Sequence, residues 1–327
     1  MKNTEIAKNQ HYVPQFLLKN FTVGKKPQIW VFDKKTGKKF KTNIKNVASE
    51  TKFYDFAFKD VELTIEPGLA DLETTAASLI KTIVKNEGIA HLDNNDKIFL
   101  SQFLALQFTR TKEHRLRFKD MSEKMAEEIR KRGWNPEDID GYKELTDNDL
   151  KVHGVKSIMD SHEFAPHFFA KSWLLFQTSK KHPFYISDNP ITMQNMNDYG
   201  FYGNIGLAVR GIEIYFPFSK TLTLALYCPS IEESLRQTYK KYQILSKLNP
   251  ALLSQHLKDP HYLEETMAGF SHQKTVRFIP DNVTNHNSLQ VKYASRFVFS
   301  STEDFSLTEE MISKYPDLKE GPKIKIG

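Results

Sequence analysis

The segment His11-Tyr12-Val13-Pro14-Gln15-Phe16-Leu17-Leu18-Lys19-Asn20-Phe21 is the most informative stretch of this 327-residue chain. Histidine is the side chain whose ordinary pKa lies closest to neutrality, so His11 could act as an acid, a base or a metal ligand. If a helix begins at Pro14, His11 lies beside its positive end, which would favour the neutral imidazole. If the segment is extended, His11 and Gln15 share one face. An N-terminal anchor with a hydrogen-bonded histidine is the structural alternative.

Composition narrows the class of protein. Apolar residues make up 39% of the chain and aromatic residues 12%, which is enough to fill a sizeable core. No run of about 18 apolar residues is present, so no membrane-spanning helix and no membrane partner are expected. Residues 1–10 are polar and lack an apolar signal core, and the single cysteine, Cys228, excludes an internal disulfide. We therefore expect a soluble cytoplasmic protein.

Positive charge is concentrated near the N-terminus. The net charge is +6, and the segment from Gly24 to Lys45 holds eight lysines against one acid, Asp33. These lysines could blunt the edge strand of a solvated hairpin. They could also contact phosphates, which makes nucleic acid a candidate partner of the Lys25–Lys45 segment.

Hydrophobic periodicity predicts an α+β fold. Residues 28–32 and 38–44 flank a turn and predict a β-hairpin with Gly37 in the left-handed conformation. Helical spacing predicts helices at 67–86, 97–132 and 147–180, the last broken near 162–166. In the C-terminal half we expect strands at 184–186, 211–218, 221–227, 275–279 and 296–300, and helices at 230–246, 250–268 and 281–294.

These elements predict one compact domain. A β-hairpin opens it, a helical middle follows, and a mixed C-terminal half is built around one antiparallel or mixed sheet. The domain would cover about residues 11–301, with a frayed N-terminus and a flexible tail from Asp317 to Gly327.

Polar residues within these elements supply candidate sites. Gln107 and Arg110 are three apart on one helix face, where arginine could bind phosphate or form a structural ion pair. Glu66 and Glu73, near a helix start, could bind Mg²⁺ or Mn²⁺, share acid–base work, or simply suit the helix dipole. Asp188, in the turn Ser187-Asp188-Asn189-Pro190, could be a base, a metal ligand or the partner of an imidazole, or could form an Asx-turn.

No familiar catalytic motif is present. The chain lacks GxxxxGK[ST], GxGxxG, GxSxG and HExxH. The sequence therefore gives no motif-based indication of a common nucleotide-binding protein, hydrolase or zinc protease.

Four short motifs, in order, resemble those of the DUF 4238 family of uncharacterised, mostly bacterial and phage proteins. They are the segment from His11 to Phe21, Gln107-Phe-Thr-Arg110-Thr, Phe184-Tyr-Ile-Ser-Asp188-Asn-Pro190 preceded by Trp173, and the run from Asn287 to Arg296. The resemblance implies that the polar members of these motifs, His11, Gln107, Arg110, Asp188 and Asn189, converge in the fold. The family pattern also implies acidic residues near Glu66 and Glu73.

Two functions follow as hypotheses. In the first, the chain is a nuclease-like hydrolase of nucleic acid: His11 is the acid or base, Arg110 stabilises phosphate charge, and Asp188 orients His11 or holds a metal. Gln15, Gln107, Asn189 and Asn287 would position the substrate. In the second, the chain is a non-enzymatic module, a sensor or regulator, that binds a nucleotide, nucleic acid or protein in the same polar cleft.

Overall fold

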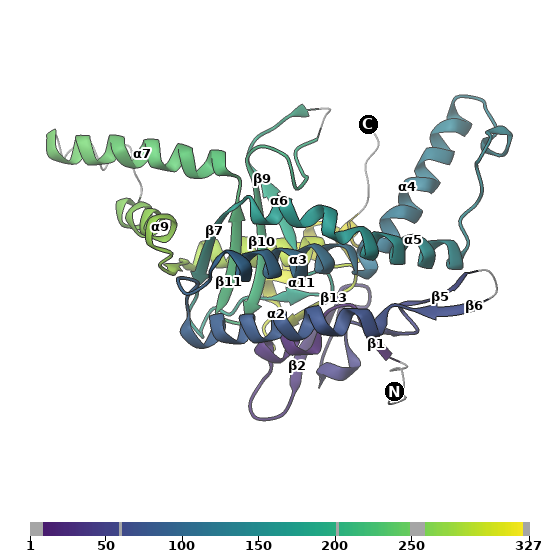
Figure 1. Ribbon diagram of the computed structural model, residues 1–327, viewed down its shortest axis with the longest axis horizontal. Helices are drawn as coiled ribbons and strands as arrows, with labels where there is room; N and C mark the ends of the chain where they lie inside the picture. Colours follow the sequence, from purple (N-terminus) through teal and green to yellow (C-terminus); the bar gives the residue numbers. More distant parts are fainter. Residues whose placement is uncertain (1–8, 59–60, 201–202, 249–258, 323–327) are drawn as a thin grey trace.

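The computed structural model describes residues 9–58, 61–200, 203–248 and 259–322, and it confirms the α+β class (Figure 1). The strands are β1 (Asn9–His11), β2 (Gln28–Asp33), β3 (Lys38–Asn43), β4 (Ser49–Thr51), β5 (Asp55–Phe58), β6 (Val61–Thr64), β7 (Ser172–Gln177), β8 (Ile186–Ser187), β9 (Thr192–Asn195), β10 (Ile212–Ser219), β11 (Leu222–Tyr227), β12 (Val276–Arg277) and β13 (Phe297–Ser300). The α-helices are α1 (Gln15–Leu18), α2 (Glu66–Asn86), α3 (Asn94–Thr109), α4 (Lys112–Lys131), α5 (Asp147–Met159), α6 (Ala165–Phe169), α7 (Pro229–Leu248), α9 (Pro260–His272), α10 (Pro280–Tyr293) and α11 (Ser306–Lys314). The short 3₁₀ helices are η1 (Lys19–Phe21), η2 (Ile44–Asn46), η3 (Pro136–Asp138), η4 (Asp160–Phe164) and η6 (Pro316–Glu320).

The larger sheet has the strand order β12-β7-β11-β10-β9, with β12 parallel to β7 and the other pairs antiparallel. Both faces are buried. Trp173 and Leu175 of β7 contact the cluster that includes α2 and α3, whereas Leu174 and Phe176 contact the cluster that includes α10. Because alternate side chains point to opposite faces, a strand covered on both sides needs a continuous apolar run, and this explains the sequence Trp-Leu-Leu-Phe.

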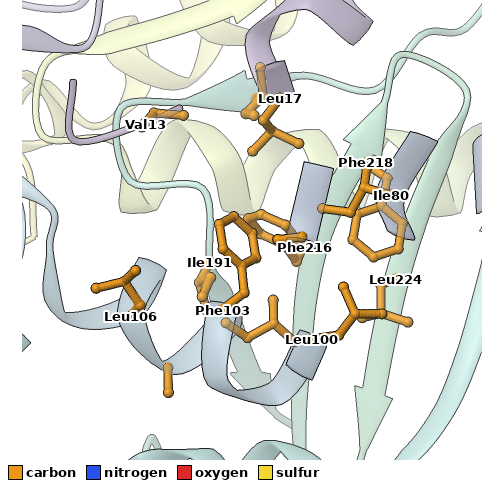
Figure 2. Close-up of a cluster of buried hydrophobic side chains, with 14 of the residues drawn as sticks. Val13, Leu17, Ile80, Leu100, Phe103, Leu106, Ile191, Phe216, Phe218 and Leu224 are labelled. Atoms are coloured by element: carbon orange, nitrogen blue, oxygen red, sulfur yellow. The ribbon is translucent and has the colours of Figure 1, made fainter. Parts of the chain in front are cut away.

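The N-terminal segment is fixed to this sheet through α3. Phe103 of α3 lies 5.7 Å from the Phe16 ring and 6.2 Å from the Phe216 ring of β10. Val13 and Leu17 join the same cluster, which Figure 2 shows between α3 and the strands. Each fully buried side chain of this size contributes roughly 1.5–3 kcal/mol. The apolar run after His11 therefore anchors the N-terminal segment, and His11 with it.

The smaller sheet joins distant parts of the chain. Its order is β3-β2-β13-β8, and every pair is antiparallel. The predicted hairpin, β2 and β3, is confirmed, and Gly37 has a φ of 71° in its turn. One sheet was expected in the C-terminal half, but β8 and β13 do not belong to the larger sheet. They pair with each other, and β13 also pairs with β2 of the hairpin. This arrangement brings the turn after β8 close to the start of β13.

Two helix predictions need correction. The predicted helix at 97–132 is interrupted: α3 ends at Thr109 and α4 begins at Lys112, because the Thr111 side chain accepts a hydrogen bond from the His114 N–H and caps a new helix. The predicted helix at 147–180 ends at Met159; after the expected break the short helix α6 follows, and residues 172–177 form the strand β7, between β12 and β11. The apolar residues of 172–177 had been interpreted as part of a helix, but they belong to a strand that is buried on both faces.

The C-terminal end is more ordered than the sequence indicated. The helix α11 was not predicted, and Pro316–Glu320 form η6 within the expected flexible tail. A Cβ built on Gly321 would lie 3.1 Å from the Ser295 Cα, so glycine allows the tail to pack against the chain just before β13. Of the N-terminus that was expected to be frayed, residues 1–8 lie outside the described residues, whereas Asn9–His11 form β1. Residues 250–258 of the predicted helix at 250–268 and residues 323–327 of the tail also lie outside them, and the rest of that predicted helix corresponds to α9.

Helical arms extend from both ends of the body. Figure 1 shows α4 and α5 at one end and α7 and α9 at the other. Among the described residues, no helix is long and apolar enough to cross a membrane.

Candidate functional site

His11 and Tyr12, neighbours in the chain, lie in different surroundings. The charges that influence His11 are those of Glu73 and Arg110. The charges that influence Tyr12 are those of Asp188, Glu50 and Arg296. The N-terminal segment therefore lies between two groups of polar residues, one near the His11 side chain and the other near the Tyr12 side chain.

The first group, which we call the Arg110 network, holds the Tyr12 carbonyl. This oxygen accepts hydrogen bonds from Gln107 Nε2 at 2.9 Å and from Arg110 Nε at 3.1 Å. Arg110 Nη1 also donates to Glu73 Oε1 at 2.6 Å. Gln107 and Arg110 act on one atom because they lie three residues apart at the end of α3, as the sequence predicted. The structural ion pair, left open as an alternative, is present.

Arg110 is inaccessible to a ligand in solution. Its side chain is fully buried, and its pKa is raised: burial opposes the charge but Tyr54, Glu73 and Glu66 outweigh it. Arg110 Nη2, Gln107 Oε1 and His11 Nε2 are buried without a hydrogen-bond partner in the described part of the chain. The network is thus only partly satisfied.

His11 belongs to β1, where it pairs with Ser49 of β4. Burial lowers the pKa of its imidazole, although backbone hydrogen bonds to Lys45 and Ile44 oppose this effect. The neutral form is favoured, as expected, but burial is the main cause rather than the end of a helix. The His11 carbonyl accepts a hydrogen bond from the Tyr54 hydroxyl at 3.0 Å.

Glu66 and Glu73, predicted as a metal pair, both lie on α2 near Arg110. Burial first, and then the charge of Glu73, raise the pKa of Glu66. Glu73 is occupied by its ion pair with Arg110. Among the described residues, no group of three or more His, Cys, Asp or Glu side chains is arranged to hold a metal ion.

The second group centres on Asp188, which follows β8. Its carboxylate accepts hydrogen bonds, each 2.8 Å long, from three consecutive backbone N–H groups: Ser295, Arg296 and Phe297. Burial raises the pKa of Asp188, whereas these N–H groups and the Lys34 charge oppose that rise. Asp188 therefore fixes the start of β13 and does not form the local Asx-turn considered from the sequence. It also does not contact His11.

Lys34 completes this group, which we call the Asp188 clamp. Its buried Nζ donates to the carbonyls of Val291 at 2.8 Å and Ala294 at 2.6 Å, at the C-terminal end of α10. A cation here suits the negative end of the helix, although burial lowers its pKa to about 8. One of the eight hairpin lysines is therefore unavailable to a polyanion. Asp33 extends the clamp through two hydrogen bonds, at 3.0 and 2.7 Å, from the Arg296 guanidinium.

An open cleft of about 650 Å³ lies on the Tyr12 side of the N-terminal segment. We call it the Tyr12 cleft; its lining includes Tyr12, Asp188 and Arg296, one residue from each of three motifs. The other residues around it are Lys35, Phe40, Thr42, Asn46, Val47, Ala48, Ser49, Glu50, Lys112, Ser295, Phe297, Lys319 and Glu320. Three of the four motifs thus contribute to this hollow. Of the five residues predicted to converge, Asp188 lines it, whereas His11, Gln107, Arg110 and Asn189 do not.

Of the remaining predicted positioning residues, two bind the chain's own backbone and one is exposed. The Asn189 amide donates to the Tyr293 carbonyl at 3.0 Å. Asn287 accepts from the Tyr185 N–H at 2.8 Å and donates to the Pro183 carbonyl at 3.0 Å. Gln15 is exposed at the start of α1. The two asparagines hold segments together, and none of the three lines the Tyr12 cleft.

Sequence reasoning missed Tyr12, Lys34 and Arg296. Tyr12 and Arg296 belong to two of the four motifs, so their position in the sequence was a usable signal. Lys34 carried no signal, because one lysine among eight in a hairpin does not reveal which of them is buried.

The family model for proteins of unknown function, DUF4238, matches residues 9–304, so the chain belongs to this family. Neither the search of curated proteins nor the search of solved structures gave a significant match.

Proposed function

We propose that this protein is a non-enzymatic binding module whose Tyr12 cleft takes single-stranded nucleic acid. The observation that carries the proposal is the pairing of an exposed aromatic ring with unpaired cations in one hollow. Phe40 is 40% exposed on β3, and Lys35 and Lys319 border the same cleft. Aromatic rings on which bases stack, combined with cations along the backbone path, are typical of single-strand binding.

Four cations and three carboxylates line the cleft: Lys35, Lys112, Arg296 and Lys319 against Glu50, Asp188 and Glu320. Lys112 is paired with Glu50, so the balance of charge is only slightly positive. Neither the Lys35 nor the Lys319 ammonium group has a hydrogen bond or ion pair within the described ranges. The Arg296 side chain is 48% exposed although it is bonded to Asp33. Asp188 faces the cleft with its charge already engaged by three N–H groups, so it repels a phosphate less than a free carboxylate would.

The hydrolase hypothesis has less support. A general base must come within about 3 Å of the proton that it removes, and His11 does not line the Tyr12 cleft. Arg110 is fully buried and engaged by Glu73. Phosphodiester cleavage by His11, Arg110 and Asp188 stays a prediction, tested alongside binding.

A matched pair of aromatic substitutions tests the proposal. Phe40→Ala and Phe169→Ala each remove a phenylalanine that is 40% exposed, but only Phe40 lies at the cleft. In fluorescence anisotropy with labelled oligo-dT and oligo-U, we expect Phe40→Ala to weaken binding about tenfold, because one stacked base is worth about 1–3 kcal/mol. Phe169→Ala should bind as the wild type does.

Two results would contradict the proposal: no binding of either oligonucleotide by the wild type at low salt, or equal weakening by both substitutions. The same oligonucleotides, incubated with Mg²⁺, Mn²⁺ or EDTA, test hydrolysis. Cleavage by the wild type that His11→Ala abolishes would restore the hydrolase hypothesis.

A further inference from the structure

A second hollow, of about 670 Å³, lies where the N-terminal anchor meets α2 and the start of the hairpin. We call it the lysine pocket, after Lys19, Lys25, Lys26 and Lys81 in its wall. The rest of its lining is Phe16, Asn20, Thr22, Gly24, Pro27, Ala77 and Ile80. It shares no lining residue with the Tyr12 cleft.

Its charge is uncompensated. Four lysines line the pocket and no carboxylate does. Other lysines of this chain are engaged: Lys34 by two carbonyls, Lys39 by Glu309 and Lys124 by Asp120. In the part of the chain that the structure describes, none of the four pocket ammonium groups has such a partner. Four like charges around one concave surface focus a positive potential into it and raise the local concentration of anions.

The floor of the pocket is apolar. Ile80 is buried, and Phe16 and Ala77 are half-buried beside it. The one amide in the wall, that of Asn20, already donates to the Phe218 carbonyl at 2.8 Å. A hollow of this volume with an apolar floor and a few polar groups at its rim is typical of small-molecule sites. Lysine ammonium groups on flexible stems can each reach a separate phosphate oxygen.

We propose that the lysine pocket binds a small molecule that carries a chain of two or more phosphates, as nucleoside polyphosphates do. The lysines neutralise the phosphate chain, and the floor of Phe16, Ala77 and Ile80 covers the apolar face of the group attached to it. This site is separate from the Tyr12 cleft and does not depend on the function proposed for it.

Isothermal titration calorimetry with tripolyphosphate and with ATP tests the proposal. The test variant is Lys19→Gln/Lys81→Gln, which removes one charge from the N-terminal anchor and one from α2. The control is Lys240→Gln/Lys241→Gln, which removes two exposed charges from α7. We expect the test variant to weaken tripolyphosphate binding at least tenfold and the control to change it less than twofold. ATP should bind more tightly than tripolyphosphate, because it also covers the floor.

Further arms separate the two sites. The variant Lys35→Gln/Lys319→Gln, at the Tyr12 cleft, should bind tripolyphosphate as the wild type does. The proposal is overturned if the wild type does not bind tripolyphosphate, if the control loses binding equally, or if only the Lys35→Gln/Lys319→Gln variant loses it. It is also overturned if the lysine pocket takes an oligonucleotide but neither tripolyphosphate nor ATP. All substitutions are at exposed positions, so thermal melting should show intact folding.

Discussion

Asp188 and Arg110 are both fully buried charged residues close to the N-terminal segment, but they are satisfied to different degrees. Asp188 accepts hydrogen bonds from three consecutive backbone N–H groups at the start of β13 and lies near the Lys34 charge. Arg110 donates to one carbonyl and one carboxylate, and its Nη2 has no partner among the described residues. A carboxylate is compact, so consecutive N–H groups of one short backbone segment can supply its hydrogen bonds. A guanidinium with five donors needs several separate acceptors, which a packed core rarely supplies.

The comparison assigns different roles to the two residues. The Asp188 clamp joins the hairpin, the turn after β8, the end of α10 and the start of β13. The Arg110 network supports the other side of the N-terminal segment, beside Tyr12. Both groups hold backbone segments in place beside Tyr12: the Arg110 network binds the Tyr12 carbonyl, and the Asp188 clamp binds the start of β13.

The largest effect is expected from Asp188→Ala. The substitution leaves three part-buried N–H groups without an acceptor, and each costs about 1–3 kcal/mol. The total, roughly 3–9 kcal/mol, is comparable with the roughly 5–15 kcal/mol that stabilises a typical domain. We expect little folded protein, measured by circular dichroism and melting. Asp71→Ala, at an exposed position on α2, is the control. A variant that melts within a few degrees of the wild type would show that the clamp is dispensable.

A smaller loss is expected from Glu73→Gln. It leaves the buried Arg110 charge without its carboxylate, at a cost of roughly 2–3 kcal/mol, less than for a fully buried pair because Glu73 is 30% exposed. Glu66→Gln, on the same helix, should be neutral or slightly stabilising, since burial and Glu73 already raise the pKa of Glu66. Urea denaturation of the two variants measures the difference. Equal destabilisation would show that Glu73 has no special relation to Arg110.

Alkaline pH tests the clamp through Lys34. The pKa of Lys34 is lowered to about 8, so the buried charge destabilises the fold below that pH. As the pH rises from about 8 toward the ordinary lysine pKa of about 10.4, the unfolded chain binds more protons than the folded one. The free energy of unfolding should therefore rise by up to about 3 kcal/mol relative to Lys34→Met. Denaturation of both proteins across this range measures it; parallel curves would contradict a buried, titrating Lys34.

The smallest effect is expected from the protonation of His11, which can be followed as the stability of the protein at acid pH. Burial lowers the pKa of His11, so the folded state favours the neutral ring. As the pH falls below about 6.5, the unfolded chain takes up the proton first and the stability decreases. His11→Gln should remove this part of the acid sensitivity. If the wild type instead becomes more stable than His11→Gln on acidification, His11 is held as a cation.

The sequence located most elements but not how they pair. The hairpin, α2, α10 and the strands β10 and β11 follow from periodicity and turn residues. The helix break at Arg110 and the strand β7 could not be predicted in this way. Both Thr111 and the run Trp-Leu-Leu-Phe are compatible with a helix as long as the layers packed against them are unknown. The same limit applied to the site: Gln107 and Arg110 were placed on one face correctly, but the atom that they bind was not evident.

By itself, then, the sequence determined the α+β class, the family and the anchoring role of the run after His11, because these depend on local spacing and on residue type. Only the tertiary structure decided that His11 and Tyr12 belong to different surroundings, that Asp188 binds backbone rather than His11, and that Lys34 alone among the hairpin lysines is buried. The physical reason is that hydrogen-bond partners and burial are set by segments up to about 260 residues apart in the chain, and local pattern carries no information about them.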